Sequence, residues 1–250
     1  MAGFNFVHCS GMDMNNYSRY EINNTNPSEK KRYIRSMFDS IVPTYDLLNR
    51  ILSLGIDNLW RRDLVKIAGL KNKIVLDLCC GTGDLTRQII KSNGKVISLD
   101  FSFNMLKKGK DRGWLTGENL SADACALPFK NSVFDFLTIA FGIRNIPDID
   151  IFLAESLRVL KPDGKLLILE LTRPDNIFVR FFYNLYLGKI LPFIGGIISG
   201  KDEAYSYLAG SISTFLEREM LIQRIKNSGF TEVSYKKKTF GIATIYICKK

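Results

Sequence analysis

The chain has very little histidine and no paired pattern of cysteines. Its only histidine, His8, lies in a polar, asparagine-rich stretch ahead of the apolar segments, which argues against a histidine base fixed in a folded core. The five cysteines, at positions 9, 79, 80, 125 and 248, form neither an even framework nor a C-x-x-C pair. These absences exclude a disulfide scaffold and a zinc-ligand spacing, so we expect a reducing compartment and no metal.

Long uninterrupted apolar runs are also absent. Residues 1–30 carry Asp13 and Glu21 and little arginine, so they predict a flexible tail rather than a secretion signal or a mitochondrial presequence. Residues 177–199 approach the length of a membrane span, but charged residues, Pro192 and paired glycines interrupt them. We expect this segment to form an aromatic lid with a face that can rest on lipid. The alternative is an inserted helix that completes the core or a dimer interface.

The charge balance is strongly basic. A formal net charge of +10 would suit nucleic acid or anionic lipid. No stretch resembles an RNA-binding signature, and the N-P-P-Y type of tetrad for a flipped base is absent. We therefore expect contact with membrane phospholipid and no nucleic-acid partner. With 250 residues and 46% hydrophobic content, the chain can bury one full core.

A tight glycine turn follows the first strongly apolar segment. Residues 75–84 read VLDLCCGTGD, an apolar strand that runs into Gly81 and Gly83. Glycines at this spacing let a strand turn sharply into a helix whose first backbone N–H groups face a ligand. Asp100 ends the next apolar run, roughly 20 residues past the glycines, where a ribose-binding carboxylate is expected. The pattern predicts a site for a nucleoside cofactor.

The charges around this turn indicate which cofactor binds. Asp77 precedes the turn and Asp84 directly follows Gly83, and two carboxylates there would repel the pyrophosphate of a dinucleotide. S-adenosylmethionine instead brings an ammonium and a sulfonium, which acidic groups can bind, and a carboxylate for the backbone N–H groups. The turn therefore predicts S-adenosylmethionine rather than NAD. The plainer alternative is that the glycines only permit a sharp turn.

Apolar periodicity predicts an α/β fold. Helical spacing runs from about residue 33 to 68 and is divided at Pro43 and Gly55. From residue 73, strands expected at 74–78, 96–100, 134–140 and 166–171 alternate with helices expected at 85–91, 103–110 and 151–160. This alternation predicts a mainly parallel sheet with right-handed crossovers. Two more strands, at 230–236 and 242–248 around Gly241, predict a C-terminal antiparallel hairpin.

Two longer stretches resemble one family. Residues 45–61, YDLLNRILSLGIDNLWR, and residues 158–174, RVLKPDGKLLILELTRP, resemble the signatures of the ubiquinone/menaquinone biosynthesis C-methyltransferases. The likeness covers residues 31–250, with Asp163 standing where the family usually has a glycine. It implies a class I S-adenosylmethionine-dependent methyltransferase with a Rossmann-like sheet, an N-terminal helical cover and an inserted lid.

The resemblance and the periodicity together divide the chain. We expect a tail at 1–30 and a single methyltransferase domain at 31–250. The parts of that domain are a helical cover at 31–70, a cofactor-binding core at 71–175, an apolar substrate lid at 176–215, and a helix and hairpin at 216–250.

The resemblance implies that Thr82, Asp100, Asp123 and Ala124 contact the cofactor. Together with the glycine turn, the expected cofactor residues are Asp77, Gly81, Thr82, Gly83, Asp100, Asp123, Ala124 and Ala140. Asp100 can accept hydrogen bonds from both ribose hydroxyls, and Asp123 can accept one from the adenine amino group beside the backbone of Ala124. The plainer alternatives are a turn residue for Thr82 and a solvated loop carboxylate for Asp123.

The residues after the strand at 134–140 form the expected acceptor site. Phe141 and Gly142 follow its carboxyl end, where ligands of open α/β folds bind. Arg144 is expected to stabilise a phenolate, with Asn145 and Tyr45 as hydrogen-bonding or positioning groups. The alternatives are a surface ion pair for Arg144, ordinary core packing for Phe141, and a helix aromatic packed on the core for Tyr45.

The implied reaction transfers the sulfonium methyl to a ring carbon of a prenylated quinol, foremost a demethylmenaquinol. Only the reduced ring is electron-rich, and loss of a phenolic proton makes the adjacent carbon more nucleophilic. Asp46 or a bound water is expected to accept that proton. Two other hypotheses stay open: a class I methyltransferase for another small molecule, and a non-catalytic cofactor-binding partner in a biosynthetic complex. We expect a cytoplasmic protein in peripheral contact with the membrane, and a homodimer fits the sequence as well.

Overall fold

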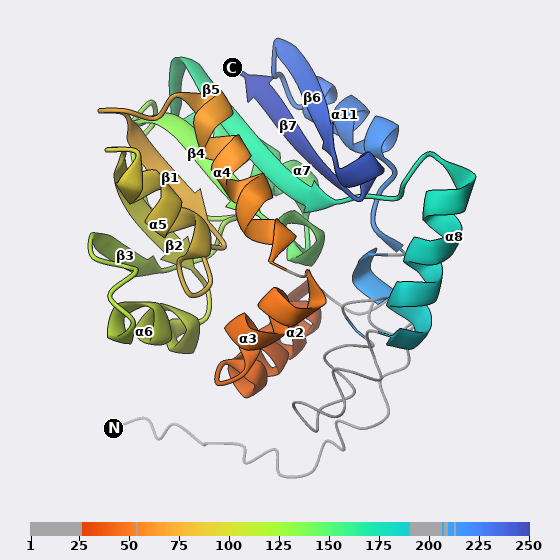
Figure 1. The fold of residues 1–250 in the computed structure, drawn as a ribbon. Helices are drawn as coiled ribbons and strands as arrows, with labels where there is room; N and C mark the ends of the chain where they lie inside the picture. The colour runs from red at the N-terminus through yellow and green to blue at the C-terminus, as the bar shows by residue number, and fades with distance from the viewer. Residues whose placement is uncertain (1–26, 54, 191–206, 208–209, 213) are drawn as a thin grey trace, which may run out of the picture.

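The computed structural model describes residues 27–53, 55–190, 207, 210–212 and 214–250, and Figure 1 shows one central sheet with helices on both faces. The strands are β1 (Ile74–Leu78), β2 (Lys95–Asp100), β3 (Glu118–Ser121), β4 (Phe134–Ala140), β5 (Leu160–Leu171), β6 (Glu232–Lys238) and β7 (Ala243–Lys249). The α-helices are α2 (Pro27–Ile41), α3 (Tyr45–Leu52), α4 (Ile56–Ala68), α5 (Asp84–Lys91), α6 (Phe103–Asp111), α7 (Ile149–Val159), α8 (Ile177–Leu185) and α11 (Arg218–Asn227). The remaining short helices are η2 (Ile143–Asn145), η3 (Tyr186–Ile190) and η4 (Thr239–Gly241).

The seven strands lie in the order β3-β2-β1-β4-β5-β7-β6. Strands β1 to β5 pair in parallel, and β7 pairs antiparallel with both β5 and β6. The predicted parallel sheet with a C-terminal antiparallel hairpin is therefore confirmed. Because the strand order reverses between β1 and β4, ligands of this kind of sheet bind beyond the carboxyl ends of these two strands.

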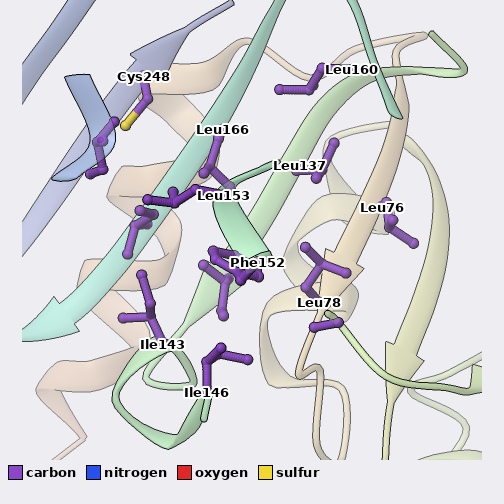
Figure 2. Close-up of a cluster of buried hydrophobic side chains, with 14 of the residues drawn as sticks. Leu76, Leu78, Leu137, Ile143, Ile146, Phe152, Leu153, Leu160, Leu166 and Cys248 are labelled. Carbon is purple, nitrogen blue, oxygen red and sulfur yellow. The ribbon is translucent and has the colours of Figure 1, made fainter. Parts of the chain in front are cut away.

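Both faces of the sheet are buried. Along β1, Leu76 and Leu78 point into a cluster that includes residues of α7 and α11, whereas Val75 points toward α4 and α5. Figure 2 shows the first cluster, with Phe152 of α7 packed among side chains of the strands. Each fully buried side chain of this size contributes roughly 1.5–3 kcal/mol. Burial on both faces explains why these strands read as near-continuous apolar runs.

Most of the predicted elements are present, with two differences. The helical cover divides at Pro43 and Gly55 into α2, α3 and α4, as predicted. Strand β3 was not predicted, and β5 begins six residues earlier than expected because its first residues pair with β4 across a register shift. Asp163 takes a positive φ of 61° inside β5, the conformation that suits the glycine of the family.

The expected tail and lid are described only in part. Helix α2 begins at Pro27, and residues 1–26 of the tail lie outside the described residues. Within the lid, α8 and η3 are described, whereas residues 191–206 are not. Among the helices that the structure describes, none is long and apolar enough to cross a membrane. The four cysteines from Cys79 onward are all free.

Candidate active site

The glycine turn between β1 and α5 is fixed by its backbone and by its packing. Gly81 and Gly83 have positive φ values of 57° and 91°, a region that glycine adopts without strain. A Cβ at Gly83 would lie 2.5 Å from Cδ2 of Leu115, so only glycine fits there. The turn places the buried Thr82 and the first turn of α5 at the carboxyl end of β1.

Asp100 ends β2 beside this turn. Its Oδ2 accepts a hydrogen bond from the backbone N–H of Gly81 at 2.8 Å, and its Oδ1 accepts one from Ser102 at 2.8 Å. Burial raises the pKa of Asp100 to about 6, although these two N–H groups oppose the shift. The carboxylate is held against the turn, and each of its oxygens keeps a lone pair for a hydroxyl donor.

Asp77 lies at the base of the turn. Its carboxylate accepts hydrogen bonds from the hydroxyls of Thr86 at 2.6 Å and Thr138 at 2.7 Å. Burial raises the pKa of Asp77 to about 6, with these hydroxyls opposing the shift. Asp77, Thr82 and Ala140 line one small cavity. The structure thus brings three predicted cofactor residues together, and the contact that each makes stays a prediction.

Asp123 and Ala124 follow β3 on the same side of the sheet as Asp100. Asp123 Oδ1 accepts a hydrogen bond from the backbone N–H of Cys125 at 3.0 Å, and its other oxygen pairs with Lys31 of α2. Ala124 is buried. A residue of the helical cover therefore contacts the carboxylate that was predicted to bind the adenine amino group.

Asp46, at the start of α3, is directed toward the cofactor residues. It accepts a hydrogen bond from the hydroxyl of Thr82 and forms ion pairs with Lys108 and Arg112. Asp46 is not among the residues that line the acceptor cavity described next. Because Asp46 is turned toward Thr82 and away from that cavity, the geometry does not support the expectation that Asp46 accepts the substrate proton.

A larger cavity of about 510 Å³ lies beyond the carboxyl ends of β4 and β5, between the helical cover and α8. Its walls are mainly apolar and aromatic and include Met37, Ile41, Tyr45, Phe141, Val179 and Phe182. Arg144 and Asn145 supply polar groups. Apolar walls with a few placed polar groups are typical of a binding site for a largely apolar small molecule.

Arg144 is held in this cavity by a buried glutamate. Its Nη1 lies 2.5 Å from Oε1 of Glu170, which also accepts a hydrogen bond from the backbone N–H of Leu171 at 2.8 Å. Only 8% of the Arg144 side chain is exposed, and its Nε has no hydrogen-bond partner within the described chain. This burial excludes the surface-ion-pair alternative for Arg144, and it leaves a donor of the guanidinium for a ligand.

Tyr45 and Asn145 are also placed by neighbours. Asn145 accepts a hydrogen bond through Oδ1 from the hydroxyl of Tyr207 at 3.1 Å. Tyr45 lines both the small cavity and the larger one, and burial raises the pKa of its hydroxyl. Tyr45 therefore lies at the junction of the two cavities.

Phe141 and Gly142 form a constrained link after β4. Phe141 has a positive φ of 60°, and the guanidinium carbon of Arg61 lies 4.9 Å from the centre of its ring. A Cβ at Gly142 would lie 2.6 Å from Cβ of Cys79, so the two loops touch. Phe141 lines the cavity, and its positive φ costs free energy. Both observations argue against the alternative that Phe141 is an ordinary core residue.

Arg61 and Glu170 belong to the site but were not among the predicted site residues. Glu170 lies near the end of an apolar strand, as Asp77 and Asp100 do, and that common position was a usable signal. Arg61 is buried and pairs with Asp57 four residues earlier on α4, a spacing that predicts an ion pair but not its burial. Arg61 lines both cavities.

The groups at the turn fit S-adenosylmethionine. Asp77 and Asp84 are buried carboxylates of the kind that its cationic groups need, with Asp84 also paired to Arg50, and Asp100 suits the ribose hydroxyls. Arg61, which pairs with Asp57, lines the small cavity as well. When bound, the cofactor supplies an electrophilic methyl group on sulfur. The task of these residues is to bind and orient it toward the larger cavity.

The strand order, the glycine turn after β1 and the carboxylate after β2 define a class I S-adenosylmethionine-dependent methyltransferase. A SAM-dependent methyltransferase from Thermotoga maritima has a TM-score of 0.62 and 20% identity, covering 86% of this chain and 98% of that chain. Phosphoethanolamine N-methyltransferase 2 from Haemonchus contortus, in complex with S-adenosyl-L-methionine, has a TM-score of 0.58 and 17% identity over 76% of this chain and 52% of that chain. At these identities the likeness shows the fold alone.

Closer relatives define the family. Residues 25–250 match the ubiE/COQ5 methyltransferase family. A ubiquinone/menaquinone biosynthesis C-methyltransferase UbiE from Shewanella halifaxensis is 38% identical over 243 residues, covering 94% of this chain and 97% of that protein. The mitochondrial 2-methoxy-6-polyprenyl-1,4-benzoquinol methylase of Dictyostelium discoideum is 33% identical over 279 residues, covering 97% and 89%. The chain belongs to the ubiE/COQ5 family and is an S-adenosylmethionine-dependent C-methyltransferase, which confirms the predicted family, activity and cofactor.

Proposed function

We propose that the chain methylates a ring carbon of a reduced, prenylated quinol, with demethylmenaquinol as the first acceptor to test. The observation that carries this proposal is the 510 Å³ cavity, in which Arg144 and Asn145 face mainly aromatic and aliphatic walls. A planar ring with an apolar tail suits such walls, and its oxygens need the few polar groups. The relatives named above methylate in ubiquinone and menaquinone biosynthesis or act on a polyprenyl benzoquinol, which supports the same acceptor class.

In this proposal Arg144 stabilises the phenolate form of the ring. Glu170 fixes the guanidinium, and burial strengthens its attraction for a negative oxygen. The phenolic proton first passes to a bound water. The ring carbon beside that oxygen then attacks the methyl carbon while the methyl–sulfur bond breaks, and the same ring carbon loses its proton to water, which restores the aromatic ring. Since Asp46 is engaged by Thr82 and two cations, a bound water is the remaining one of the two expected acceptors for the phenolic proton.

We also propose that the outer face of α8 rests on a lipid surface. Ile177, Phe178, Phe181 and Phe182 are all more than 60% exposed along this helix, which lies at the edge of the molecule in Figure 1. An exposed aromatic face on a protein with a net charge of +10 suits an anionic bilayer. A prenylated acceptor resides in such a bilayer, and Phe182 also lines the cavity. Cytoplasmic placement and a homodimer stay predictions.

Methyl transfer from labelled cofactor tests the proposed reaction. Purified protein is incubated with short-chain prenylated naphthoquinol and benzoquinol, each kept reduced in one arm and oxidised in the other. We expect a labelled methyl on a ring carbon in the reduced arms, with Arg144→Met as the inactive control. Equal turnover of the oxidised acceptors, or methylation at oxygen, would refute the mechanism.

A further inference from the structure

Tyr183 has a buried hydroxyl that no other group of the described chain satisfies. It lies on the inner side of α8, is 9% exposed, and lines the acceptor cavity. Its hydroxyl oxygen is inaccessible to solvent and has no hydrogen-bond partner among the described residues. A buried polar atom without a partner costs free energy, so a site that keeps one gains from a ligand that satisfies it.

Other tyrosine hydroxyls of the same cavity are already engaged. The hydroxyl of Tyr207 donates to Asn145 at 3.1 Å, and the hydroxyl of Tyr45 interacts with Asn49. Both bonds hold residues of the cavity wall in place. The hydroxyl of Tyr183 differs from them because it has no such bond within the described residues.

The surroundings of Tyr183 keep it a donor. Burial raises the pKa of its hydroxyl, the positive charge of Arg144 opposes this shift, and Glu170 reinforces it. The group is therefore protonated at neutral pH and can donate to an oxygen acceptor. Arg144 and Tyr183 line the same cavity, so one small ring bound there can be in reach of both.

We propose that Tyr183 donates a hydrogen bond to a ring oxygen of the quinol, so that α8 forms part of the substrate site and distinguishes rings by their oxygens. This inference rests on the proposed function and extends it to a second point of recognition besides Arg144. It also assigns two roles to one helix. The inner face of α8 binds the ring through Tyr183, and the outer face carries the exposed Phe178 and Phe181.

Binding of quinols to Tyr183→Phe tests this inference. The variant removes the hydroxyl and keeps the ring, and Tyr235→Phe, on the exposed strand β6, is the matched control for the same chemical change. Each protein is saturated with S-adenosylhomocysteine and titrated with a reduced naphthoquinol and with the two naphthols that lack one ring oxygen each. Urea unfolding of each protein is measured in parallel.

We expect Tyr183→Phe to bind the quinol about tenfold more weakly than the parent protein and the control, the scale of one hydrogen bond. One of the two naphthols should bind the parent and Tyr183→Phe equally, because it lacks the oxygen that Tyr183 contacts. The urea midpoint of Tyr183→Phe should equal or exceed that of the parent, since the hydroxyl lost has no partner in the protein.

Three outcomes would overturn the inference or its basis. Unchanged quinol affinity in Tyr183→Phe would remove Tyr183 from substrate recognition. A urea midpoint below those of the parent and Tyr235→Phe would show that the hydroxyl serves the fold instead. Failure of the parent protein to bind any quinol, with S-adenosylhomocysteine bound normally, would refute the proposed function itself.

Discussion

Replacing Glu170 with glutamine tests the buried pair that positions Arg144. The substitution keeps the shape and one acceptor oxygen but removes the negative charge. Glu170 is fully buried, and 8% of the Arg144 side chain is exposed, so water cannot replace the lost partner. Glu170→Gln therefore leaves a cation in the core of the site without its counter-charge.

The expected loss of stability follows from these contacts. Breaking one side of a buried ion pair costs about 3–5 kcal/mol. Because the glutamine oxygen can still accept from Arg144 Nη1 or from the backbone N–H of Leu171, we expect the lower end, about 3 kcal/mol. For a chain of this length that corresponds to a fall in Tm of roughly 6–12 °C. The guanidinium also loses its fixed orientation, so kcat should fall by about 10²-fold.

A double variant separates the two effects. In Arg144→Met/Glu170→Gln no charge is left unpaired, so the free energy of unfolding should return to within about 1.5 kcal/mol of the parent value while methyl transfer stays lost. Urea unfolding gives the stability, and single-turnover methyl transfer gives the rate. If Glu170→Gln unfolds at the parent midpoint and keeps the parent kcat, the pair neither stabilises the fold nor positions Arg144.

Four further predictions concern the same site and α8. Arg144→Lys should lower the single-turnover rate about 10²-fold with unchanged cofactor affinity, because an ammonium lacks the planar fork; a near-parent rate would contradict a role at the ring oxygen. Asp100→Ala should weaken cofactor binding by about 1.5–3 kcal/mol in calorimetry. Burial raises the pKa of Asp100 to about 6, and hydroxyl donors of the ribose favour the ionised carboxylate. The cofactor Kd should therefore fall as pH rises from 5 to 7 and then level off, whereas a flat pH profile would argue against Asp100 as the ribose-binding group. Phe178→Ser/Phe181→Ser should reduce co-sedimentation with anionic vesicles relative to Ile151→Ser, whose side chain is exposed on α7; equal binding would remove α8 from the lipid surface.

Strands that are buried on both faces could be predicted from the sequence, and β3 could not. The core strands β1, β4 and β5 carry apolar residues on both faces, which gives a strong signal. Strand β3 is a four-residue edge strand, Glu-Asn-Leu-Ser, that has no such run. Only its pairing with β2 makes it a strand, and pairing is a tertiary property.

Some residues of the candidate site could also be predicted from the sequence, whereas the contacts between them could not. Asp77 and Asp100 could be predicted because a carboxylate at the end of an apolar strand is visible in the sequence. The partner of Arg144 could not, because Glu170 lies 26 residues away and meets it only through the pairing of β4 with β5. The engagement of Asp46 by cations of α6 and the loop after it likewise depends on how the cover packs.

The helical cover contacts the predicted cofactor residues directly. Three side chains of α2 and α3 each bond to a group beside the turn: Lys31 to Asp123, Asp39 to the Ser102 hydroxyl, and Asp46 to the Thr82 hydroxyl. A ligand that bonds to Asp123 or Thr82, as predicted for the cofactor, would share these side chains with the cover. The predicted cofactor contacts therefore lie next to α2 and α3, and Tyr45 of α3 also lines the larger cavity, so the helical cover borders both parts of the candidate site.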